Sequence, residues 1–284
     1  MGIPDFRGQG TESWILWDRK MAAALVQHYP KLSFEALVRM RFKAASEVPS
    51  AIFEYHLSHE LNYSEKGSSR KFRIVRLLGG QRYEGLSKGK CLDLGCGSGS
   101  SLVAIAEDFQ LGLGVDVLMQ DLILGKKYAE EAGINKVHYI CAFGENLPFE
   151  PETFDFVNAT DTIEHIEDAQ VAFLREVKRV LKPGGVFCFN SPNRFNLFTP
   201  EPHVKIWGLG FLPRAWMNPA CRMIRGVEYH GKRLLSYFEL KSILKKTFGR
   251  RFFITGLIID PSQAKKRLIG KLFTFLPFTL KILN

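Results

Sequence analysis

The sequence predicts an α/β protein built on a doubly wound, mainly parallel sheet with helices on both faces. Short apolar segments typical of strands alternate with longer helical segments between residues 90 and 191, and this rhythm indicates βαβ units. A turn with three glycines, Gly95-Cys-Gly-Ser-Gly99, directly follows the first strand. In an open parallel sheet such a turn lies at the carboxyl end of its strand, where ligands bind.

Each predicted element has its own signal. Apolar residues at three- and four-residue spacing indicate helices, and short apolar runs bounded by turn residues indicate strands. Ser236 and Glu239 form a capping box that begins the last helix. Helices are expected in three segments within 14–61 and over 69–78, 100–109, 119–133, 171–182 and 236–248, and strands over 90–95, 111–117, 136–142, 154–160, 184–191 and 251–260.

The cysteine and apolar patterns bound the kind of protein. Five cysteines are scattered through 284 residues, with no CxxC pair and no paired histidines at ligand spacing. They are therefore expected to be free thiols in a reducing compartment, and no metal site is predicted. The N-terminus lacks the layout of a signal peptide, and no apolar run reaches the roughly 18 residues of a spanning helix. We expect a cytoplasmic protein.

The spacing of the glycine turn separates two classes of ligand. A dinucleotide-binding turn has the pattern GxGxxG, but Gly95, Gly97 and Gly99 follow at intervals of two, and Ser100 stands where the third glycine belongs. Asp93, in the strand before the turn, is unfavourable beside a diphosphate and favourable beside a positive centre. The turn therefore predicts a cationic ligand. A nicotinamide-dependent oxidoreductase and a non-catalytic binding module are the alternatives.

From about Lys90 to Ser191 the chain resembles the class I S-adenosylmethionine-dependent methyltransferases. LDLGCGSGS is similar to their first motif, GVDV to their second strand with its terminal acid, and ENLPFEPETFDFV to the approach to their fourth strand. IEHIED and FLREVKRVLKPGGVFCFNSPN are similar to the segments that follow. The resemblance implies a Rossmann-like, seven-stranded-type sheet, S-adenosylmethionine as cofactor, and methyl transfer to a small-molecule, glycan or lipid-linked acceptor, with oxygen the favoured atom.

The resemblance also divides the chain into four regions. Residues 1–80 are expected to form an N-terminal helical cap and 81–191 the S-adenosylmethionine-binding core. Residues 192–235 are an insertion or lid on the acceptor side, because this stretch is rich in proline and aromatic residues and long for a plain connection. Residues 236–284 complete the core and carry a basic tail.

The cofactor contacts are likewise implied by the resemblance. The glycines let the main chain approach the methionine part, and Asp93 holds the amides of the turn or the ammonium group through water. Asp116 either accepts hydrogen bonds from the ribose hydroxyls or only caps its strand. Family members often have an acid where this chain has Phe143, so adenine either stacks on Phe143 or bonds to the nearby main chain. The expected cofactor contacts are Asp93, Gly95, Gly97, Gly99, Asp116, Val117, Met119, Phe143, Gly144, Glu145, Thr160 and, from the cap, Tyr63.

Transfer to a hydroxyl also requires a group that takes the hydroxyl proton. The candidates are Asp161, Glu164 and His165 after the fourth strand, and His203 and His230 in the insertion. His165 is favoured because histidine titrates near neutral pH; alternatively, Glu164 and His165 only shape the loop. The aromatic residues of the insertion line an acceptor pocket or form a satellite core, the latter being expected for most of them: Phe195, Phe198, Trp207, Phe211 and Trp216.

The net charge of +10 is concentrated at the C-terminal end. Residues 241–284 contain ten Lys or Arg and one acidic residue, Asp260. Two interpretations stay open: the tail lies on an anionic membrane surface, or it completes the sheet as a last strand and helix with its lysines in solvent. No aromatic and basic platform accompanies the charge, so nucleic acid is not the expected partner. Nothing in the sequence predicts an oligomeric state.

Overall fold

A computed structural model describes residues 2–8, 12–44, 54, 57, 58, 60–256 and 278–283. Its helices are α1 (Ser13–His28), α2 (Phe34–Ala44), α4 (Tyr63–Leu78), α5 (Gly80–Ser87), α6 (Ser100–Ala106), α7 (Met119–Glu131), α8 (Gln170–Val180), α9 (Arg214–Arg225) and α10 (Tyr237–Phe248), with the 3-10 turns η1 (Ile163–His165) and η2 (Leu209–Phe211). Its strands are β1 (Lys90–Leu94), β2 (Leu111–Asp116), β3 (Val137–Cys141), β4 (Phe154–Thr160), β5 (Leu181–Ser191), β6 (Phe252–Thr255) and β7 (Phe278–Leu283).

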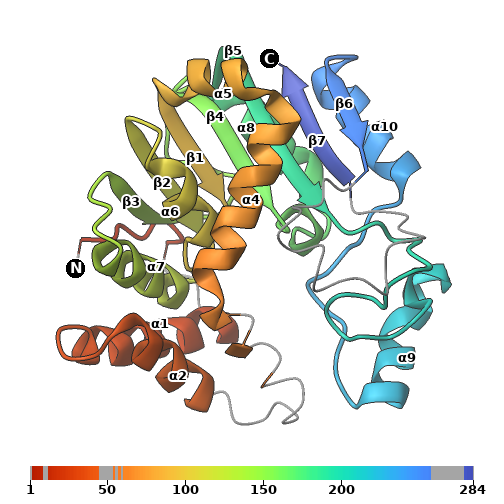
Figure 1. Cartoon of the computed structure of the whole chain (residues 1–284). Coiled ribbons are helices and arrows are strands. Elements are labelled where there is room, and N and C mark those ends of the chain that lie inside the picture. The colour runs from red at the N-terminus through yellow and green to blue at the C-terminus, as the bar shows by residue number, and fades with distance from the viewer. Residues whose placement is uncertain are drawn as a thin grey trace.

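The strands form one sheet in the order β3-β2-β1-β4-β5-β7-β6 (Figure 1). The first five in this order are parallel to one another, whereas β7 is antiparallel to both β5 and β6. The predicted α/β fold with a mainly parallel sheet is confirmed for the five parallel strands. Of the strand expected over 251–260, Phe252–Thr255 form β6, and residues 257–260 lie outside the described part of the chain. β6 is at the edge of the sheet, because β7 takes the place beside β5.

Some element boundaries differ from the prediction. The helix expected from 69 begins at Tyr63, and the helical segment expected over 50–61 lies largely outside the described residues. The strand expected from 184 begins at Leu181. The register between β4 and β5 shifts just after that residue, since Pro183 lacks an amide hydrogen and the two glycines after it bend the chain.

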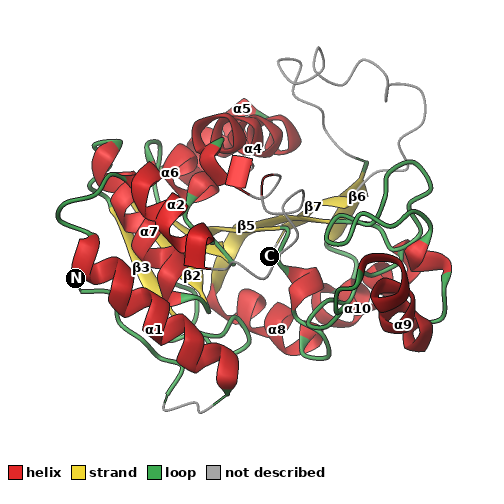
Figure 2. Ribbon diagram, turned by 90° about the horizontal axis from the view of Figure 1, so that it is seen from below, coloured by secondary structure: helices red, strands yellow, loops and turns green. Residues whose placement is uncertain are grey.

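Helices cover both faces of the sheet, as Figure 2 shows: α4, α5 and α6 lie on one face, and α8 and α10 on the other. A strand covered on both faces is apolar along its length, and Leu92, Leu94 and Phe187 are all fully buried. The helical cap packs through α1 and α2 against α7, in a cluster of its own. The hydrophobic core therefore holds the centre of the sheet rigid and leaves the ends of its strands to form a site.

The order of the strands reverses beside β1. From β1 the chain moves outward through β2 to β3, and then returns to β4 on the other side of β1. Ligands of open α/β sheets bind at the carboxyl ends of the strands at such a reversal. The glycine turn follows β1 there, and the segment 161–165 follows β4. Two groups of residues singled out by the sequence therefore meet at one crevice.

The insertion lies at the same end of the sheet. In Figure 1, α9 is below the sheet on the right, and α1 and α2 are below it on the left. The satellite core of the insertion consists of Val204, Ile206, Leu209, Met217, Cys221 and Tyr229. None of the five aromatic residues expected there belongs to this core. The expectation is wrong for Trp207, Trp216, Phe211 and Phe195, which are 64%, 68%, 48% and 40% exposed. On α9 the buried face is set by Met217 and Cys221, one helical turn apart, and Trp216 projects from a different face.

Candidate active site

The glycine turn has a main-chain conformation that other residues resist. Gly95, Gly97 and Gly99 have φ of +64°, +52° and +82°, in the left-handed region that favours glycine. A Cβ on Gly95 would lie 2.4 Å from the methyl carbon of Thr162, whereas a Cβ on Gly97 would meet nothing within 4 Å. The turn thus packs against the segment after β4 at Gly95 and faces open space at Gly97. This open, side-chain-free surface fits the close approach of a ligand to main chain.

Asp116, at the end of β2, fixes this turn. Gly97 donates its amide hydrogen to Oδ2 at 2.8 Å, and Leu118 donates to Oδ1 at 3.0 Å. Each carboxylate oxygen has a second lone pair, so Asp116 can also accept hydrogen bonds from a diol. Burial raises the pKa of Asp116, and the three nearby amides act in the opposite direction.

Asp93 lies beneath the same turn and is 2% exposed. Its Oδ1 accepts a hydrogen bond of 2.6 Å from Asn158, and its Oδ2 has no hydrogen-bond partner in the part of the chain that the structure describes. Burial raises the pKa of Asp93 to about 6. A positively charged ligand above the turn would stabilise this carboxylate, because an opposite charge favours the ionised form.

The residues expected around adenine follow the carboxyl ends of β2 and β3. Val117, Met119, Phe143 and the pair Gly144–Glu145 are all half-buried. A Cβ on Gly144 would lie 2.8 Å from the Phe173 ring of α8, so this glycine is required by packing in the structure as it stands. The structure thus brings these residues to one edge of the crevice.

The N-terminal cap contributes side chains there that the sequence did not single out. The rings of Trp14 and Phe143 meet edge to face, with centroids 6.3 Å apart. Arg7 is buried between Asp18 and the main-chain oxygen of Val117, to which it donates hydrogen bonds of 2.7 Å each. Asp18 in turn accepts a hydrogen bond from the amide of Met119 at 3.0 Å. The first residues of the chain therefore brace the segment after β2.

Tyr63 reaches the turn indirectly. Its buried hydroxyl donates to Glu60 Oε1 at 3.0 Å, and Ser98 of the turn donates to the same oxygen at 2.8 Å. Although burial raises it, the pKa of Glu60 is lowered overall by the charges of Arg41 and Lys66. Glu60 thus links the cap to the turn. The sequence gives no signal of this link, because a charged residue in an amphipathic helical segment usually faces solvent.

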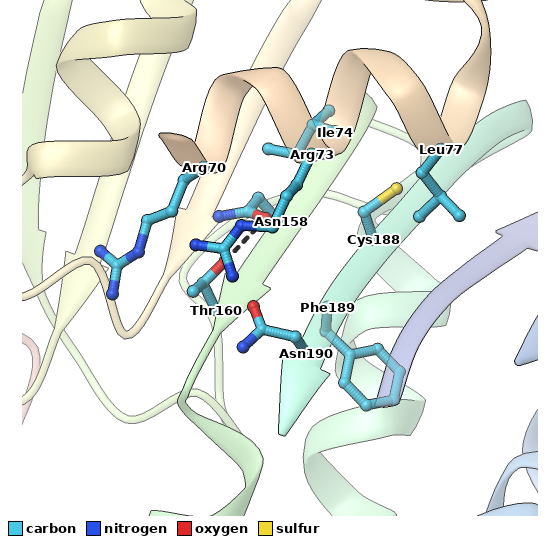
Figure 3. Close-up of a pocket in the computed structure, with 9 residues that line it drawn as sticks. All are labelled: Arg70, Arg73, Ile74, Leu77, Asn158, Thr160, Cys188, Phe189 and Asn190. Carbon is cyan, nitrogen blue, oxygen red and sulfur yellow. Dashed lines mark hydrogen bonds between the residues drawn. The ribbon is translucent and has the colours of Figure 1, made fainter. Parts of the chain in front are cut away.

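Thr160 lies at the end of β4 and lines a small cavity of about 20 Å³ together with Asn190 and Arg70. Figure 3 shows these side chains between α4 and the strands β4 and β5. Arg70 donates to Ser100 at 2.9 Å and to Asp161 at 3.3 Å, and Asn190 donates to Asp161 at 2.6 Å. Asp161 has φ of +53°, an uncommon conformation for a residue other than glycine. These hydrogen bonds hold Asp161 in this conformation, directly after β4.

The segment after β4 and the insertion bring two histidines face to face. The Nε2 atoms of His165 and His203 are 3.3 Å apart, although the whole of α8 and β5 and the first quarter of the insertion separate the two residues in the chain. Glu201 orients the second ring, because its Oε1 lies 2.5 Å from His203 Nδ1. Its other oxygen accepts the amides of His203 and Val204 at 2.7 Å each, and Tyr229 donates to Oε1 at 3.1 Å. His203 is thus fixed by a buried carboxylate.

Glu164 lies beside this pair and is 1% exposed, with no hydrogen-bond partner for Oε2 among the described residues. Burial, and then the charge of Asp161, raise the pKa of Glu164 to about 8. Burial of the ring, and then His203, lower the pKa of His165 to about 4, whereas the accessible surface of the whole residue is that of an exposed residue.

His230 lies apart from this pair. Its Nε2 is 2.8 Å from Glu228 and 3.3 Å from Asn218, both within the insertion. The structure thus brings together two of the three histidines that the sequence suggested.

Comparison with known proteins agrees with the site. A family model described as a methyltransferase domain matches residues 92–189. The chain is 31% identical over 183 residues to a ubiquinone biosynthesis O-methyltransferase of Idiomarina loihiensis, covering 63% of this chain and 68% of the relative. A protein of the same name from Klebsiella pneumoniae is 26% identical over 64% of this chain and 70% of its own. An S-adenosylmethionine-dependent methyltransferase structure from Mesorhizobium loti has a TM-score of 0.55 at 17% identity, over 76% of this chain and 98% of that one, and shares the fold.

The chain belongs to the class I S-adenosylmethionine-dependent methyltransferases. It is an enzyme whose cofactor is S-adenosylmethionine, and the open glycine turn between Asp93 and Asp116 fits that group. No helix in the described ranges combines the length and apolar character that crossing a membrane requires.

Proposed function

We propose that this methyltransferase methylates a phenolic hydroxyl on a small, lipid-linked acceptor. S-adenosylmethionine supplies the methyl group, and its sulfur leaves as the thioether of S-adenosylhomocysteine. The main contributions of the protein are alignment of the acceptor oxygen, exclusion of water and removal of the hydroxyl proton. The observation that carries the proposal is the His165–His203 pair, 3.3 Å apart, at the carboxyl end of β4 beside the glycine turn.

The glycine turn and the histidines are in contact through one residue. Thr162 touches Gly95 from the acceptor side, donates a hydrogen bond to the Leu94 main-chain oxygen at 3.0 Å, and lies three residues before His165. A methyl donor on the turn and an acceptor at the histidines would therefore share one crevice. A neutral histidine ring has a free lone pair that can accept the hydroxyl proton. Because the pKa of His165 is lowered to about 4, the ring is a weak base that would pass the proton on to solvent.

We propose the cofactor roles on the same geometry. Gly95, Gly97 and Gly99 receive the methionine part, and Asp116 receives the ribose hydroxyls. The half-buried edge formed by Val117, Met119 and Phe143 receives adenine. Each of the four regions of the chain then has one role. The cap (1–80) closes over the cofactor, and the core (81–191) holds it. The insertion (192–235) covers the acceptor, and the last region (236–284) completes the sheet.

Two observations support a lipid-linked phenol over a glycan. The relatives carry the name ubiquinone biosynthesis O-methyltransferase, and that name specifies oxygen as the methylated atom. In addition, α9 presents Trp216, Met223 and Ile224 to solvent, with exposed fractions of 68%, 83% and 53%. An exposed apolar surface of this kind marks a site of interaction.

We infer that this face of α9 rests on an anionic membrane surface. Arg222 and Arg225 are also exposed on α9, and an amphipathic helix that combines apolar and basic residues binds at the lipid headgroups. Arg222 also pairs with Glu228, so the positive charge there is partly balanced. The basic tail adds to the attraction; its residues 257–277 lie outside the described part of the chain.

The function is tested by ligand binding and then by turnover. S-adenosylhomocysteine at 100 times its Kd should stabilise the native state by about 2.7 kcal/mol and raise Tm, whereas NAD should leave Tm unchanged. Radiolabelled cofactor should then methylate phenols that carry an alkyl chain, and His165→Ala should lower this turnover at least tenfold while the Kd of S-adenosylhomocysteine stays the same. Absence of any shift with S-adenosylhomocysteine would refute the cofactor assignment, and wild-type turnover in the variant would refute the role of His165.

A further inference from the structure

Glu201, in the insertion, is a buried carboxylate with hydrogen-bond donors on both of its oxygens. The residue is 6% exposed. Its Oε2 accepts the main-chain amides of His203 and Val204, and its Oε1 accepts the Tyr229 hydroxyl and lies 2.5 Å from His203 Nδ1. Burial raises the pKa of Glu201, but the hydrogen bond and the charge of His203 outweigh burial and lower the pKa overall. Glu201 is therefore ionised at neutral pH and only accepts hydrogen bonds.

Glu201 determines which nitrogen of His203 carries the proton. A neutral imidazole has a proton on one nitrogen and a lone pair on the other, and the hydrogen bond made by one nitrogen sets the state of both. Because the carboxylate offers no proton, His203 Nδ1 donates to it and Nε2 keeps the lone pair. The opposite tautomer would place a lone pair against a carboxylate oxygen at 2.5 Å, which is repulsive.

The tautomer of His165 follows from that of His203. The two Nε2 atoms are 3.3 Å apart, and the rings meet edge to face at an interplanar angle of 90°. Since Nε2 of a neutral His203 is an acceptor, the proton between the rings belongs to His165 Nε2. The lone pair of His165 is then at Nδ1, where it can take the proton of a hydroxyl.

We propose that Glu201 is a positioning residue that makes the two histidines a proton relay for the methylated hydroxyl. The relay runs from the hydroxyl to His165 Nδ1, and from His165 Nε2 to His203 Nε2. It rests on the proposed function and adds to it the roles of His203 and Glu201, which lie 36 and 38 positions after His165 in the order Glu201, His203.

Protons and electrons balance in this transfer. The O–H bond of the acceptor breaks and leaves its electron pair on oxygen, which forms the new bond to the methyl carbon, while the carbon–sulfur bond breaks and leaves its pair on sulfur. His165 gains a proton at Nδ1 and gives up the one at Nε2, so its ring stays neutral. His203 becomes an imidazolium beside the ionised Glu201. The side chain of His203 is 18% exposed and His165 is exposed, so the extra proton can leave to solvent and both rings regain their first tautomers.

The relay compensates for the low basicity of His165. Burial of the ring, and then the charges of His203 and Lys232, lower the pKa of His165 to about 4, so a positive charge on this ring is unfavourable at neutral pH. In the relay His165 never becomes positive. The charge arises on His203, where the adjacent carboxylate of Glu201 favours the protonated ring.

Nuclear magnetic resonance of the full chain with ¹⁵N-labelled histidine tests the tautomers directly, because protonated and bare ring nitrogens resonate at well-separated frequencies. The signals of His165 and His203 are identified by their loss in His165→Ala and His203→Gln. At pH 8 we expect the proton on Nδ1 in His203 and on Nε2 in His165. A proton on Nε2 of His203 at this pH, whether alone or together with one on Nδ1, overturns the relay.

Glu201→Gln separates positioning from packing. The amides of His203 and Val204 still point at the former Oε2, so the oxygen of the new glutamine faces them and its NH₂ group faces His203 Nδ1. Nδ1 then has to accept a hydrogen bond, and the ring proton moves to Nε2. We expect this reversed tautomer and a kcat lowered about tenfold or more, with KM for an alkyl phenol and the Tm shift with S-adenosylhomocysteine unchanged.

Glu228→Gln is the matched control, because Glu228 lies 2.8 Å from His230, the other histidine of the insertion. This variant should keep the wild-type kcat and the His203 tautomer. An unchanged His203 tautomer in folded Glu201→Gln overturns the positioning role, and a wild-type kcat with the reversed tautomer overturns the relay.

The tautomers are measured without an acceptor, so the two proposals can fail separately. The expected tautomers in a chain that methylates no phenol would refute the proposed function and leave the positioning role of Glu201 standing. Methylation of a phenol by a chain with the opposite tautomers would refute the relay and leave the proposed function standing.

Discussion

The two sides of the crevice are built in different ways. On the side proposed for the cofactor, the main chain of one short turn provides the surface, and the carboxylate that holds the Gly97 amide is Asp116, within the same βαβ unit. On the acceptor side the surface consists of side chains, and His165 meets His203 only because the insertion folds back onto η1. The first side is local in sequence, and the second depends on contacts between distant segments.

This difference shows what each side can tolerate. A main-chain surface is sensitive to any side chain placed where glycine stands, because there is no room or no suitable conformation for it. A side-chain surface can change its residues while the fold stays the same, and with them its acceptor. The cofactor side is therefore suited to an unchanging ligand and the acceptor side to a ligand that varies between proteins.

The comparison predicts its largest effect at the glycine turn. Gly95→Ala should lower the free energy of unfolding by about 2 to 4 kcal/mol, since the left-handed conformation and the clash with Thr162 both oppose it. Gly97→Ala should cost only about 1 to 2 kcal/mol, because its Cβ meets open space. The affinity of the Gly97→Ala variant for S-adenosylhomocysteine should nevertheless fall at least tenfold, since the methyl side chain of the new alanine enters the space proposed for the ligand. Urea unfolding and titration calorimetry measure the two quantities.

Each glycine variant is the control for the other. If the main chain of the turn is the ligand surface, Gly95→Ala should show the larger loss of stability and Gly97→Ala should show the loss of affinity. If Gly97→Ala bound S-adenosylhomocysteine as tightly as the wild type, the open face of the turn would not be the ligand surface. Equal losses of stability in both variants would contradict the packing difference.

A second prediction concerns the outer surface of the acceptor side. Replacing Trp216, Met223 and Ile224 by serine should lower co-sedimentation with anionic vesicles about tenfold or more, because each buried apolar side chain contributes about 1.5 to 3 kcal/mol. Leu16→Ser on α1, which removes a side chain that is 52% exposed, is the control on the cofactor side and should sediment like the wild type. Unchanged sedimentation of the triple variant would show that α9 does not contact the membrane.

The sequence could predict the strand, the glycine turn and the terminal acid of the side proposed for the cofactor, for a physical reason. The alternation of strands and helices, the three glycines and the acid at the end of β2 all express local requirements, and a local requirement leaves its pattern in neighbouring residues. The position of Asp116 beside Gly97 follows from the parallel pairing of β1 with β2. The support by Trp14, Arg7 and Glu60 could not be predicted, because it depends on how the cap packs on the core.

The acceptor side could be predicted only as a set of alternatives. The sequence favours His165 but leaves His203 and His230 as alternatives. Only the folded insertion shows that Glu201 orients His203 while Glu228 lies beside His230. The tail is similar: β7 pairs with β5 and β6, which agrees with the sheet interpretation for 278–283. In each case the decisive contact joins segments that are far apart in the chain.

The smallest predicted effect tests how the insertion is anchored. Ser236 and Glu239 form the expected capping box of α10, and Glu239 also accepts a hydrogen bond of 2.7 Å from Arg214 at the start of α9. Ser236→Ala should therefore lower the free energy of unfolding by about 1 kcal/mol.

The same anchor predicts a dependence on pH. Burial raises the pKa of Glu239, but the hydrogen bonds from Ser236 and Arg214 outweigh it and lower the pKa from 4.5 to about 2. Because the folded-state pKa is the lower one, this stabilisation is complete above pH 4.5 and is lost as the pH falls towards 2. Urea unfolding at pH 7 and pH 3 should show that Glu239→Gln loses less stability than the wild type over this interval.

In Ser236→Ala the Kd of S-adenosylhomocysteine should stay unchanged, since the anchor lies wholly on the acceptor side. A higher Kd in this variant would mean that the two sides are coupled.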